Sequence, residues 1–306
     1  MMRSLLLAMS RSRWLRERAM RSRWARRAVS RFMPGEDLED MIGAARALAP
    51  DGIRAVFTRL GENVTDAAEA DAVAAHYAAA IARAAEAGVD AEPSVKPTQL
   101  GLDLGVAGCL ARMRAVAGHA HAAGRFLWID MEHSPTVEPT LEITQRLRAE
   151  FPGVGVCVQA YLRRTPADVA ALAAAGAGVR LVKGAYSEPA SLAWTRRADI
   201  DRAYLETADT MLAASRAGRV RAVFGTHDLA LVDAIRARAA AAGMPAGAVE
   251  VHMLYGIQRE AQARLVAGGV TLRVLVAYGS HWFPWYMRRL AERPANVGFA
   301  LRRLFG

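Results

Sequence analysis

Short aliphatic runs alternate with alanine-rich helical segments along most of the chain, and this alternation restricts the fold more than any other feature. Runs with the composition of strands span residues 53–58, 93–96, 126–130, 154–159, 179–183, 220–226, 249–254 and 271–277. Segments with helical spacing follow them at residues 65–87, 105–123, 136–150, 166–175, 199–217, 228–242, 258–268 and 282–292. Eight strand–helix units in about 250 residues are typical of a (βα)8 barrel, an α/β fold with parallel strands inside a ring of helices.

A doubly wound sheet of the dinucleotide-binding type is the alternative arrangement of the same units. It normally has a glycine-rich turn after its first strand, but that turn reads Leu60-Gly-Glu-Asn-Val64 in this chain. The spaced glycines Gly101, Gly105 and Gly108 do not fit the dinucleotide fingerprint either. The barrel is therefore the predicted fold.

The chain before the first strand is expected to form a separate N-terminal part. A lead-in helix is predicted at residues 36–49, because apolar side chains recur there at helical spacing and Pro50-Asp-Gly52 follows. The predicted division is a basic helical arm with the lead-in helix over residues 1–50, and a barrel over residues 51–306. Three helix starts inside the barrel are predicted from capping residues: Thr65 before Asp66, Thr165 before Pro166, and Asp228.

The formal net charge of +10 belongs to the arm and not to the body of the chain. Residues 1–31 contain ten arginines and a single acid, Glu17, which gives a net charge of +9. The other 275 residues contain 30 basic and 29 acidic side chains. A nearly neutral body excludes a nucleic-acid-binding barrel, because nucleic-acid binding needs a basic face.

The cysteine and hydropathy patterns predict a cytoplasmic protein. Cys109 and Cys157 cannot build a disulfide framework, which indicates a reducing compartment. No apolar run approaches the roughly 18–20 residues of a membrane-spanning helix. The arginine-rich start resembles a mitochondrial transit peptide, but an N-terminal helix pair of a bacterial protein, with Trp14, Met20 and Trp24 packed inward, is the favoured interpretation.

Lysine is almost absent from the chain. Of 40 basic residues, only Lys96 and Lys183 are lysines. An arginine can replace a lysine that is merely exposed to solvent on the surface. It cannot replace a lysine that serves as a compact point charge or as a nucleophile. Both lysines are therefore functional candidates, the alternative being chance survival on the surface. Both end predicted strands, and the carboxyl ends of barrel strands form the active-site face.

Two kinds of chemistry are compatible with such a face. A lysine inside a barrel can form a Schiff base with a carbonyl substrate. Alternatively, Lys183 could help to hold the phosphates of a cofactor while Arg288 and Arg289 clamp a carboxylate, for which guanidinium groups have the matching geometry. The competing interpretation of Arg288 is a solvated ion pair with Glu292, four residues later.

Several strings resemble those of proline dehydrogenases of the short, monofunctional bacterial type. The most specific in combination are Arg180-Leu-Val-Lys-Gly-Ala-Tyr186 and Met287-Arg-Arg-Leu-Ala-Glu-Arg-Pro-Ala-Asn296. Further strings are Met253-Leu-Tyr-Gly256, Ser94-Val-Lys96, Asp130-Met-Glu132, Gln159-Ala-Tyr161 and Ala222-Val-Phe-Gly-Thr-His-Asp228. The resemblance extends along nearly the whole chain.

This resemblance implies a distorted (βα)8 TIM barrel that holds FAD without a dinucleotide fingerprint. It implies oxidation of L-proline to Δ1-pyrroline-5-carboxylate, with hydride passing from the ring carbon beside nitrogen to flavin N5 and electrons passing to a quinone. No metal is expected. Because such a quinone lies in a membrane, the basic arm could hold the enzyme at anionic lipid on the inner face of the membrane.

The resemblance also implies roles for individual residues. The substrate carboxylate would contact Lys96, Arg288 and Arg289, with Asp130 supporting the arginines and Tyr186 and Leu254 forming walls. The flavin ring would contact Arg180 and Gln159, and the rest of the cofactor Lys183, Gly184, Ala185, Thr226 and His227. Glu292 would contact the cofactor or orient Arg289.

Some pocket positions depart from the usual pattern of the family. Leu275 and Trp285 replace tyrosines, His133 an acid, His252 a glutamine, and Pro97 an aliphatic residue. An open wall at Leu275 could admit hydroxyproline or another N-substituted amino acid, including one from a specialised biosynthetic pathway. The same flavin chemistry on such a substrate is the first alternative function, and a Schiff-base lyase that uses Lys183 or Lys96 is the second.

Overall fold

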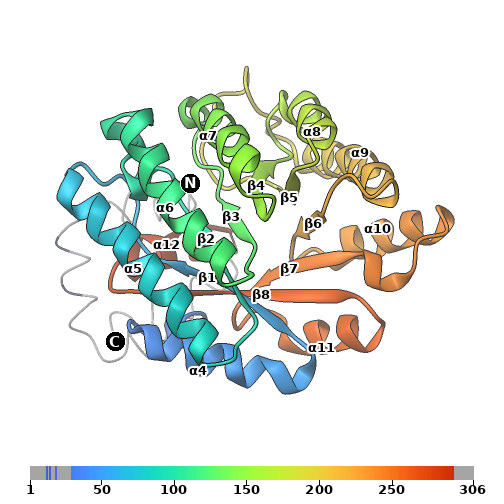
Figure 1. Ribbon diagram of the computed structural model, residues 1–306. Coiled ribbons are helices and arrows are strands. Elements are labelled where there is room, and N and C mark those ends of the chain that lie inside the picture. Colours follow the sequence, from blue (N-terminus) through green and yellow to red (C-terminus); the bar gives the residue numbers. More distant parts are fainter. Residues whose placement is uncertain (1–11, 13, 15–17, 19–28, 293–306) are drawn as a thin grey trace.

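Eight parallel strands close into a barrel in which β8 pairs with β1 (Figure 1). The computed structural model describes residues 12, 14, 18 and 29–292, except for the side chains of residues 288–292. The strands are β1 (Arg54–Arg59), β2 (Ala91–Val95), β3 (Leu127–Ile129), β4 (Val154–Gln159), β5 (Gly178–Val182), β6 (Ala222–Gly225), β7 (Glu250–Leu254) and β8 (Thr271–Tyr278). The predicted barrel is confirmed, and the doubly wound alternative is wrong because the sheet closes on itself.

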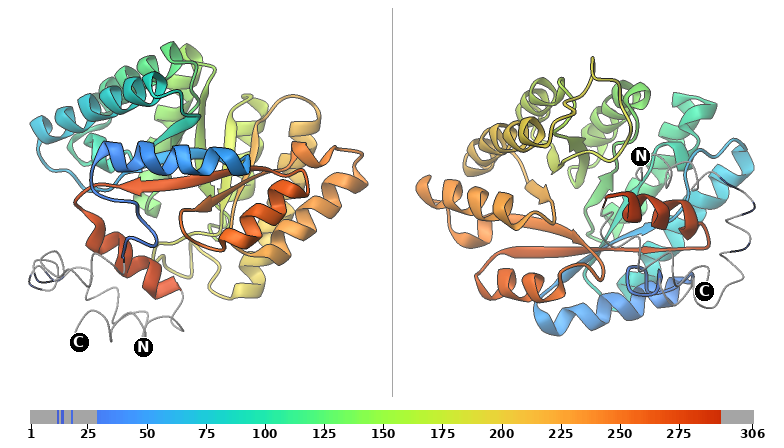
Figure 2. Two further views of the ribbon diagram at one scale, coloured as in Figure 1. Left: turned by 90° about the horizontal axis from the view of Figure 1, so that it is seen from below. Right: turned by 180° about the vertical axis from the view of Figure 1, so that it is seen from behind.

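Helices follow the strands and surround the barrel (Figure 2). They are α5 (Ala67–Glu86), α6 (Val106–Ala122), α7 (Val137–Glu150), α8 (Thr165–Ala174), α9 (Arg197–Arg216), α10 (Leu229–Ala241) and α11 (Arg259–Ala267). A further helix, α12 (Trp282–Glu292), follows β8. The predicted lead-in helix is α4 (Leu38–Leu48), which packs against β1 and β8. Short 3-10 turns are η1 (Ala49–Asp51), η2 (Thr98–Leu100), η3 (Leu102–Leu104), η4 (Ser134–Thr136) and η5 (Ala246–Ala248). No helix within the described ranges is long and apolar enough to span a membrane.

The buried side chains of the strands form two layers, one on each face of the sheet. Successive side chains of a strand point to opposite faces. In β1, Phe57 stacks on Tyr77 of α5 with ring centroids 6.3 Å apart, so it lies between the sheet and the helices. The preceding residue, Val56, belongs instead to a small buried cluster inside the barrel with Trp128 and Val223. One layer therefore anchors the outer helices, and the other fills the barrel.

Charged side chains close the amino-terminal end of the barrel interior. We call Glu92, Arg221, Glu250 and Arg273 the floor network. Arg273 lies 3.0 Å from Glu92 and 3.4 Å from Glu250, measured between guanidinium nitrogen and carboxylate oxygen. Arg221 contacts the same two carboxylates at 2.8 and 2.6 Å. Each of these buried or half-buried charges thus has two partners of opposite sign within the network, which offsets the cost of removing it from water.

His252 lies next to the floor network on β7. Its Nε2 atom is 3.0 Å from a Glu250 oxygen, and its ring meets that of Trp128 edge-on at 5.6 Å. Burial lowers the pKa of His252 to about 4, although Glu250 opposes this shift. The imidazole therefore stays neutral at neutral pH.

The buried histidine makes stability depend on pH. In the unfolded chain His252 binds a proton near pH 6.5, but in the folded chain only near pH 4, so stability falls as pH drops through this window. At about 1.4 kcal/mol per pKa unit, we expect a loss of about 2 kcal/mol between pH 7 and pH 5, measurable by urea unfolding at these two pH values. His252→Gln should flatten the difference and exposed His121→Gln should retain it; equal slopes in wild type and His252→Gln would contradict the prediction.

The predicted helix starts are partly wrong in detail. The residue that caps α5 is Asp66 and not Thr65, because the Asp66 carboxylate accepts hydrogen bonds from the amides of residues 68 and 69. Thr165 is the first residue of α8, and its hydroxyl donates to the Gln159 carbonyl at 2.5 Å. Asp228 does precede α10, but its carboxylate pairs with cations and makes no capping bond.

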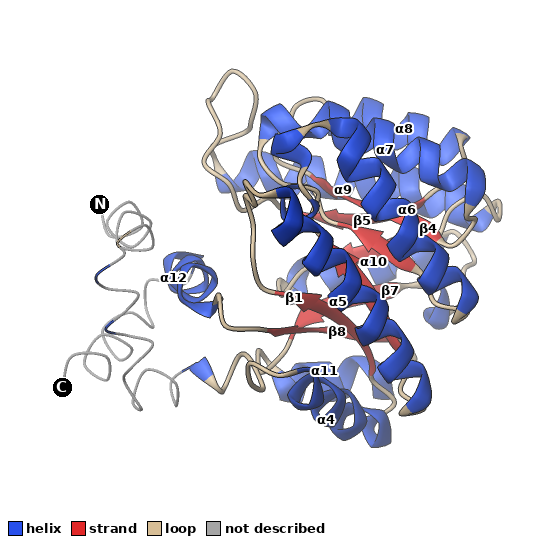
Figure 3. Ribbon diagram, turned by 60° about the vertical axis from the view of Figure 1, so that its left-hand side comes forward, coloured by secondary structure: helices blue, strands red, loops and turns tan. Residues whose placement is uncertain are grey.

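α12 stands outside the ring of helices, beyond the end of β8 (Figure 3). Its Trp282 indole donates to Glu36 at 3.2 Å, and its Tyr286 ring lies 6.2 Å from that of Phe32. The segment before α4 thus holds α12 at the carboxyl-terminal face of the barrel. Most of the predicted arm lies outside the described residues. Trp14, which was predicted to pack inward, is 66% exposed, with the Arg18 guanidinium 5.8 Å from its ring.

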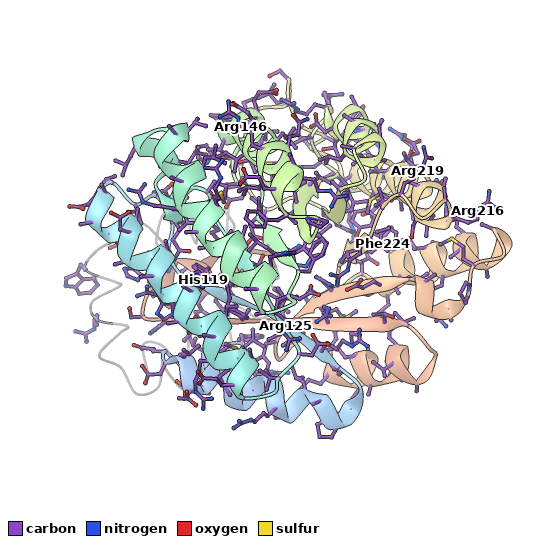
Figure 4. All side chains as sticks on the ribbon, viewed as in Figure 1. His119, Arg125, Arg146, Arg216, Arg219 and Phe224 are labelled. Carbon is purple, nitrogen blue, oxygen red and sulfur yellow. The ribbon has the colours of Figure 1, made fainter. Side chains whose placement is uncertain are left out.

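The charges of the body are spread over its outer surface. Arg146, Arg216 and Arg219 are exposed on the outer helices and the turn that follows one of them, whereas Phe224 of β6 is fully buried (Figure 4). Arg146 pairs with Glu142 one turn earlier at 2.6 Å. Such exposed pairs contribute little to stability, in contrast to the charges of the floor network.

Candidate active site

The carboxyl ends of the strands bring together four polar side chains, Ser94, Lys96, Asp130 and Arg180, which we call the mouth cluster. Asp130 follows β3 and forms an ion pair with Arg180 of β5. Ser94 donates to the same carboxylate at 2.9 Å and accepts from Arg180 at 2.8 Å. The ammonium of Lys96, the residue that follows β2, lies 3.5 Å from the second Asp130 oxygen. Two cations therefore share one carboxylate.

The mouth cluster is charged although it is largely shielded from water. Burial would raise the pKa of Asp130, but Arg180 and Lys96 outweigh it and hold that pKa below its usual value. Burial would lower the pKa of Lys96, but Asp130 and neighbouring acids raise it above the usual value. With both cations ionised against one carboxylate, the cluster has one positive charge left to bind an anion.

This charge state argues against a Schiff-base mechanism at Lys96. A lysine nucleophile must lose its proton, which happens when the pKa is depressed. The pKa of Lys96 is raised instead. An ammonium that remains protonated is suited to binding a carboxylate.

Residues outside the predicted site position the mouth cluster. The Thr58 hydroxyl accepts from Lys96 at 3.4 Å. Tyr77 accepts from the Arg59 amide at 3.0 Å and donates to the Ser94 carbonyl at 3.1 Å, so it joins β1 to β2. Sequence reasoning did not assign Thr58 or Tyr77 a role, because their partners depend on the register of strands that are distant in the sequence.

Glu132 supports the loop that follows Lys96. Its two oxygens accept from the backbone amide and the hydroxyl of Thr98, at 2.9 and 2.8 Å. Burial raises the pKa of Glu132 despite these bonds. The sequence singled out Glu132 only as part of the string Asp130-Met-Glu132 and did not indicate this contact.

Gln159 carries an unsatisfied buried group. Its Oε1 atom is buried and has no hydrogen-bond partner among the described residues, while its Nε2 atom is 3.5 Å from the Met131 carbonyl. Buried polar atoms are rarely left without a partner in native proteins. The N–H of a flavin ring is a donor of the required kind, so the predicted role of Gln159 fits.

The predicted phosphate-side residues gather around the ends of β5 and β6. The Lys183 ammonium lies 2.5 Å from Asp201 and 2.8 Å from Asp228. The Thr226 hydroxyl accepts from the Asp228 amide at 3.0 Å. Asp201 is a partner that the sequence did not suggest, since it lies 18 residues after Lys183 on α9.

His227 and Leu254 are brought together at the ends of β6 and β7. The Leu254 amide donates to the Nε2 atom of His227 at 3.1 Å. Two residues that the resemblance assigns to the cofactor and to the substrate thus share a hydrogen bond across neighbouring strands.

The remaining predicted residues lie on the β5–α9 loop and on α12. Gly184 has a φ of +117°, and an added Cβ would lie 2.2 Å from the Tyr161 ring, so a side chain is excluded there. Ala185 and Tyr186 follow it and are half-buried. The side chains of Arg288, Arg289 and Glu292 lie outside the described residues, but their backbone belongs to α12 at the same face of the barrel.

The fold and the mouth cluster together define a barrel enzyme whose site can bind an anionic substrate beside a cofactor. The model of the family described as proline dehydrogenase matches residues 41–302. Proline dehydrogenase 1 of Bacillus subtilis (strain 168) is 34% identical over 302 residues, which cover 99% of this chain and 98% of that protein. Proline dehydrogenase of Deinococcus radiodurans is 35% identical over 283 residues, 90% of this chain and 89% of that one. The chain belongs to the proline dehydrogenase family.

Solved structures confirm the fold. Proline utilization A from Bdellovibrio bacteriovorus superimposes with a TM-score of 0.80 at 23% identity, over 87% of this chain and 32% of that one. Proline utilization A from Bradyrhizobium japonicum, in a mutant form, gives a TM-score of 0.75 at 24% identity, over 92% of this chain and 32% of that one. This chain therefore spans about a third of the length of these structural relatives.

Proposed function

We propose that this chain oxidises L-proline to Δ1-pyrroline-5-carboxylate with FAD as its cofactor. Membership of the family supports the reaction, and the excess positive charge of the mouth cluster is the observation in the structure that carries it. L-Proline carries a negatively charged carboxylate. The Lys96 ammonium, held in place by Asp130, gives this carboxylate a fixed position to bind. Neither the hydroxyproline-type alternative nor the lyase alternative gains support from the relatives.

The substrate side of the site is proposed as follows. Lys96, together with Arg288 and Arg289, holds the carboxylate, and Asp130 fixes the orientation of the cations. Tyr186 and Leu254 wall the ring and exclude water from it. Rigid anchoring of one end of a small substrate aligns its reacting carbon, which is how binding energy lowers the barrier.

The cofactor side is proposed to use two sets of residues. Arg180 and Gln159 would face the flavin ring, and Lys183, Gly184, Ala185, Thr226, His227 and Glu292 would contact the rest of FAD. Bound FAD would supply the two-electron oxidation by accepting hydride at N5. Arg180 is well placed to keep a fixed orientation, because its guanidinium is held by Asp130 and Ser94 and lies 5.0 Å from the Trp128 ring.

The electron acceptor is proposed to be a quinone. The net charge of +9 over residues 1–31 supports a peripheral contact between the arm and the anionic inner face of a membrane, with the barrel on the cytoplasmic side. The division into an arm with a lead-in helix, residues 1–50, and a barrel, residues 51–306, remains part of this proposal. Deletion of residues 1–31 should abolish co-sedimentation with anionic vesicles; unchanged co-sedimentation would remove this role.

The proposed reaction is tested on the purified protein. We expect a yellow protein with an absorption band at about 450 nm, the usual flavin region. Anaerobic L-proline should bleach this band, with Δ1-pyrroline-5-carboxylate detected by mass spectrometry, whereas D-proline should not. A colourless protein that borohydride and a carbonyl substrate link at Lys96 or Lys183 would instead support the lyase. A yellow protein that hydroxyproline bleaches much faster than proline would support the altered substrate.

A further inference from the structure

Two loops at the mouth of the barrel are joined near their tips. The β3–α7 loop begins at Asp130, and the β5–α9 loop spans residues 183–196. The Glu188 carboxylate accepts two hydrogen bonds from Ser134, from the backbone amide at 2.7 Å and from the hydroxyl at 2.5 Å. The adjacent His133 ring lies 6.4 Å from the Tyr186 ring. His133 and Ser134, which are consecutive, thus contact Tyr186 and Glu188 of the β5–α9 loop.

The Glu188 contact occupies the start of a helical segment. Ser134 is the first residue of η4, which runs directly into α7. Amide groups at the start of a helix have no partner within it, and a carboxylate there also interacts favourably with the helix dipole. Both carboxylate oxygens of Glu188 are used, which fixes the direction of the side chain as well as its distance.

The two ends of the β5–α9 loop are fixed elsewhere. The Tyr161 amide donates to the Lys183 carbonyl at 2.9 Å, and the Trp194 amide donates to the Tyr161 carbonyl at 2.7 Å. Both contacts attach the base of the loop to the turn after β4. Tyr186 lies between this base and the Glu188 contact, so its position depends on how the outer part of the loop is held.

We propose that Glu188 is a positioning residue that clamps the β5–α9 loop to Ser134 and thereby holds Tyr186 over the bound substrate. This inference rests on the proposed function, in which Tyr186 forms a wall of the proline site. The clamp orders the loop before the substrate binds. The free energy of substrate binding is therefore not spent on ordering the loop. It acts on binding of proline and not on the chemical step.

The clamp predicts a split between KM and kcat. In Glu188→Ala we expect KM for L-proline to rise about tenfold, the size expected for loss of charge-assisted hydrogen bonds, with kcat within about threefold of wild type. Glu188→Gln keeps acceptor capacity and should recover part of the loss. Ser134→Ala removes only the hydroxyl donor and should raise KM less. Glu138→Ala, an exposed acid in the first turn of α7, is the matched control and should leave KM unchanged.

A double-mutant cycle tests whether Glu188 acts through Tyr186. If it does, Glu188→Ala should raise KM no further in a Tyr186→Ala background, because coupled residues are not additive. An equal factor in both backgrounds would show that Glu188 does not position Tyr186 and would overturn the proposal. A fall in kcat with unchanged KM would overturn it as well.

A measurement without substrate separates this inference from the proposed function. Hydrogen exchange of the segment around residues 131–140 should be faster in Glu188→Ala than in wild type and in Glu138→Ala. Equal protection would overturn the clamp even if the enzyme oxidises proline. Faster exchange with unchanged KM would overturn the positioning role alone. Failure of the wild type to oxidise proline would overturn the proposed function itself, together with the role of Tyr186 on which the clamp rests.

Discussion

Replacement of Asp130 by asparagine is expected to lower kcat/KM for L-proline at least about 100-fold. The change leaves Arg180 and Lys96 without their shared counter-charge, and loss of one partner of a buried ion pair costs about 3–5 kcal/mol. Because about 1.4 kcal/mol corresponds to a factor of ten, even part of this cost in the transition state gives the predicted factor. Steady-state kinetics with L-proline, corrected for flavin content, measure it.

A matched control and the pH dependence sharpen this prediction. Asp233→Asn removes an exposed carboxylate whose nearest arginine is 3.6 Å away on α10, and should not change kcat/KM. The pKa of Asp130 is lowered in the folded protein, so the stability that it contributes is present above its unfolded value and is lost as pH falls through the folded value. An Asp130→Asn enzyme with kcat/KM within tenfold of wild type would contradict the assigned role.

Replacement of Glu92 by alanine is expected to lower the free energy of unfolding by about 3–5 kcal/mol. Glu92 accepts from Trp128 at 2.8 Å and contacts Arg221 and Arg273 at 2.8 and 3.0 Å. Its removal leaves both guanidinium groups with less than their full counter-charge inside the barrel. At about 2–4 °C per kcal/mol for a large domain, the unfolding temperature should fall by about 10 °C, measurable by calorimetry and urea titration.

The effect should be confined to stability and to buried carboxylates. Glu142→Ala removes an exposed acid that pairs with Arg146 and should change the unfolding free energy by less than about 1 kcal/mol. At 25 °C the folded Glu92→Ala enzyme should keep its KM for proline, because the floor network lies at the opposite end of the barrel from Lys96. A Glu92→Ala protein as stable as Glu142→Ala would show that the floor network does not hold the barrel together.

Periodicity made the fold predictable. Strand positions such as 154–159 and helix positions such as 282–292 coincide with β4 and α12 in the structure. Parallel strands that are buried on both faces require continuous aliphatic runs. Such a run can be recognised from the local sequence alone. Capping was less predictable, since Thr65 and Asp66 are both suitable caps and only the local backbone decides between them.

Candidate site residues could be proposed from the sequence only where a residue type or a motif is informative in itself. The scarcity of lysine singled out Lys96 and Lys183, and the resemblance to proline dehydrogenases implied a role for Asp130 in the substrate pocket and for Arg180 beside the flavin ring. Asp201, Glu188 and Ser134 gave no such signal, because acids and serines are common on loops and helices and their roles depend on a partner far away in the sequence.

The sequence by itself determined the order and type of the elements and the family, because these follow from local periodicity and from motifs. Only the tertiary structure decided which charges meet. Asp130 is 50 residues from Arg180, and Glu188 is 54 residues from Ser134, so closure of the barrel is what brings each pair together. Whether Lys96 is suited to be a Schiff-base nucleophile or a carboxylate anchor depends on that pairing, since a carboxylate 3.5 Å away favours its protonated form.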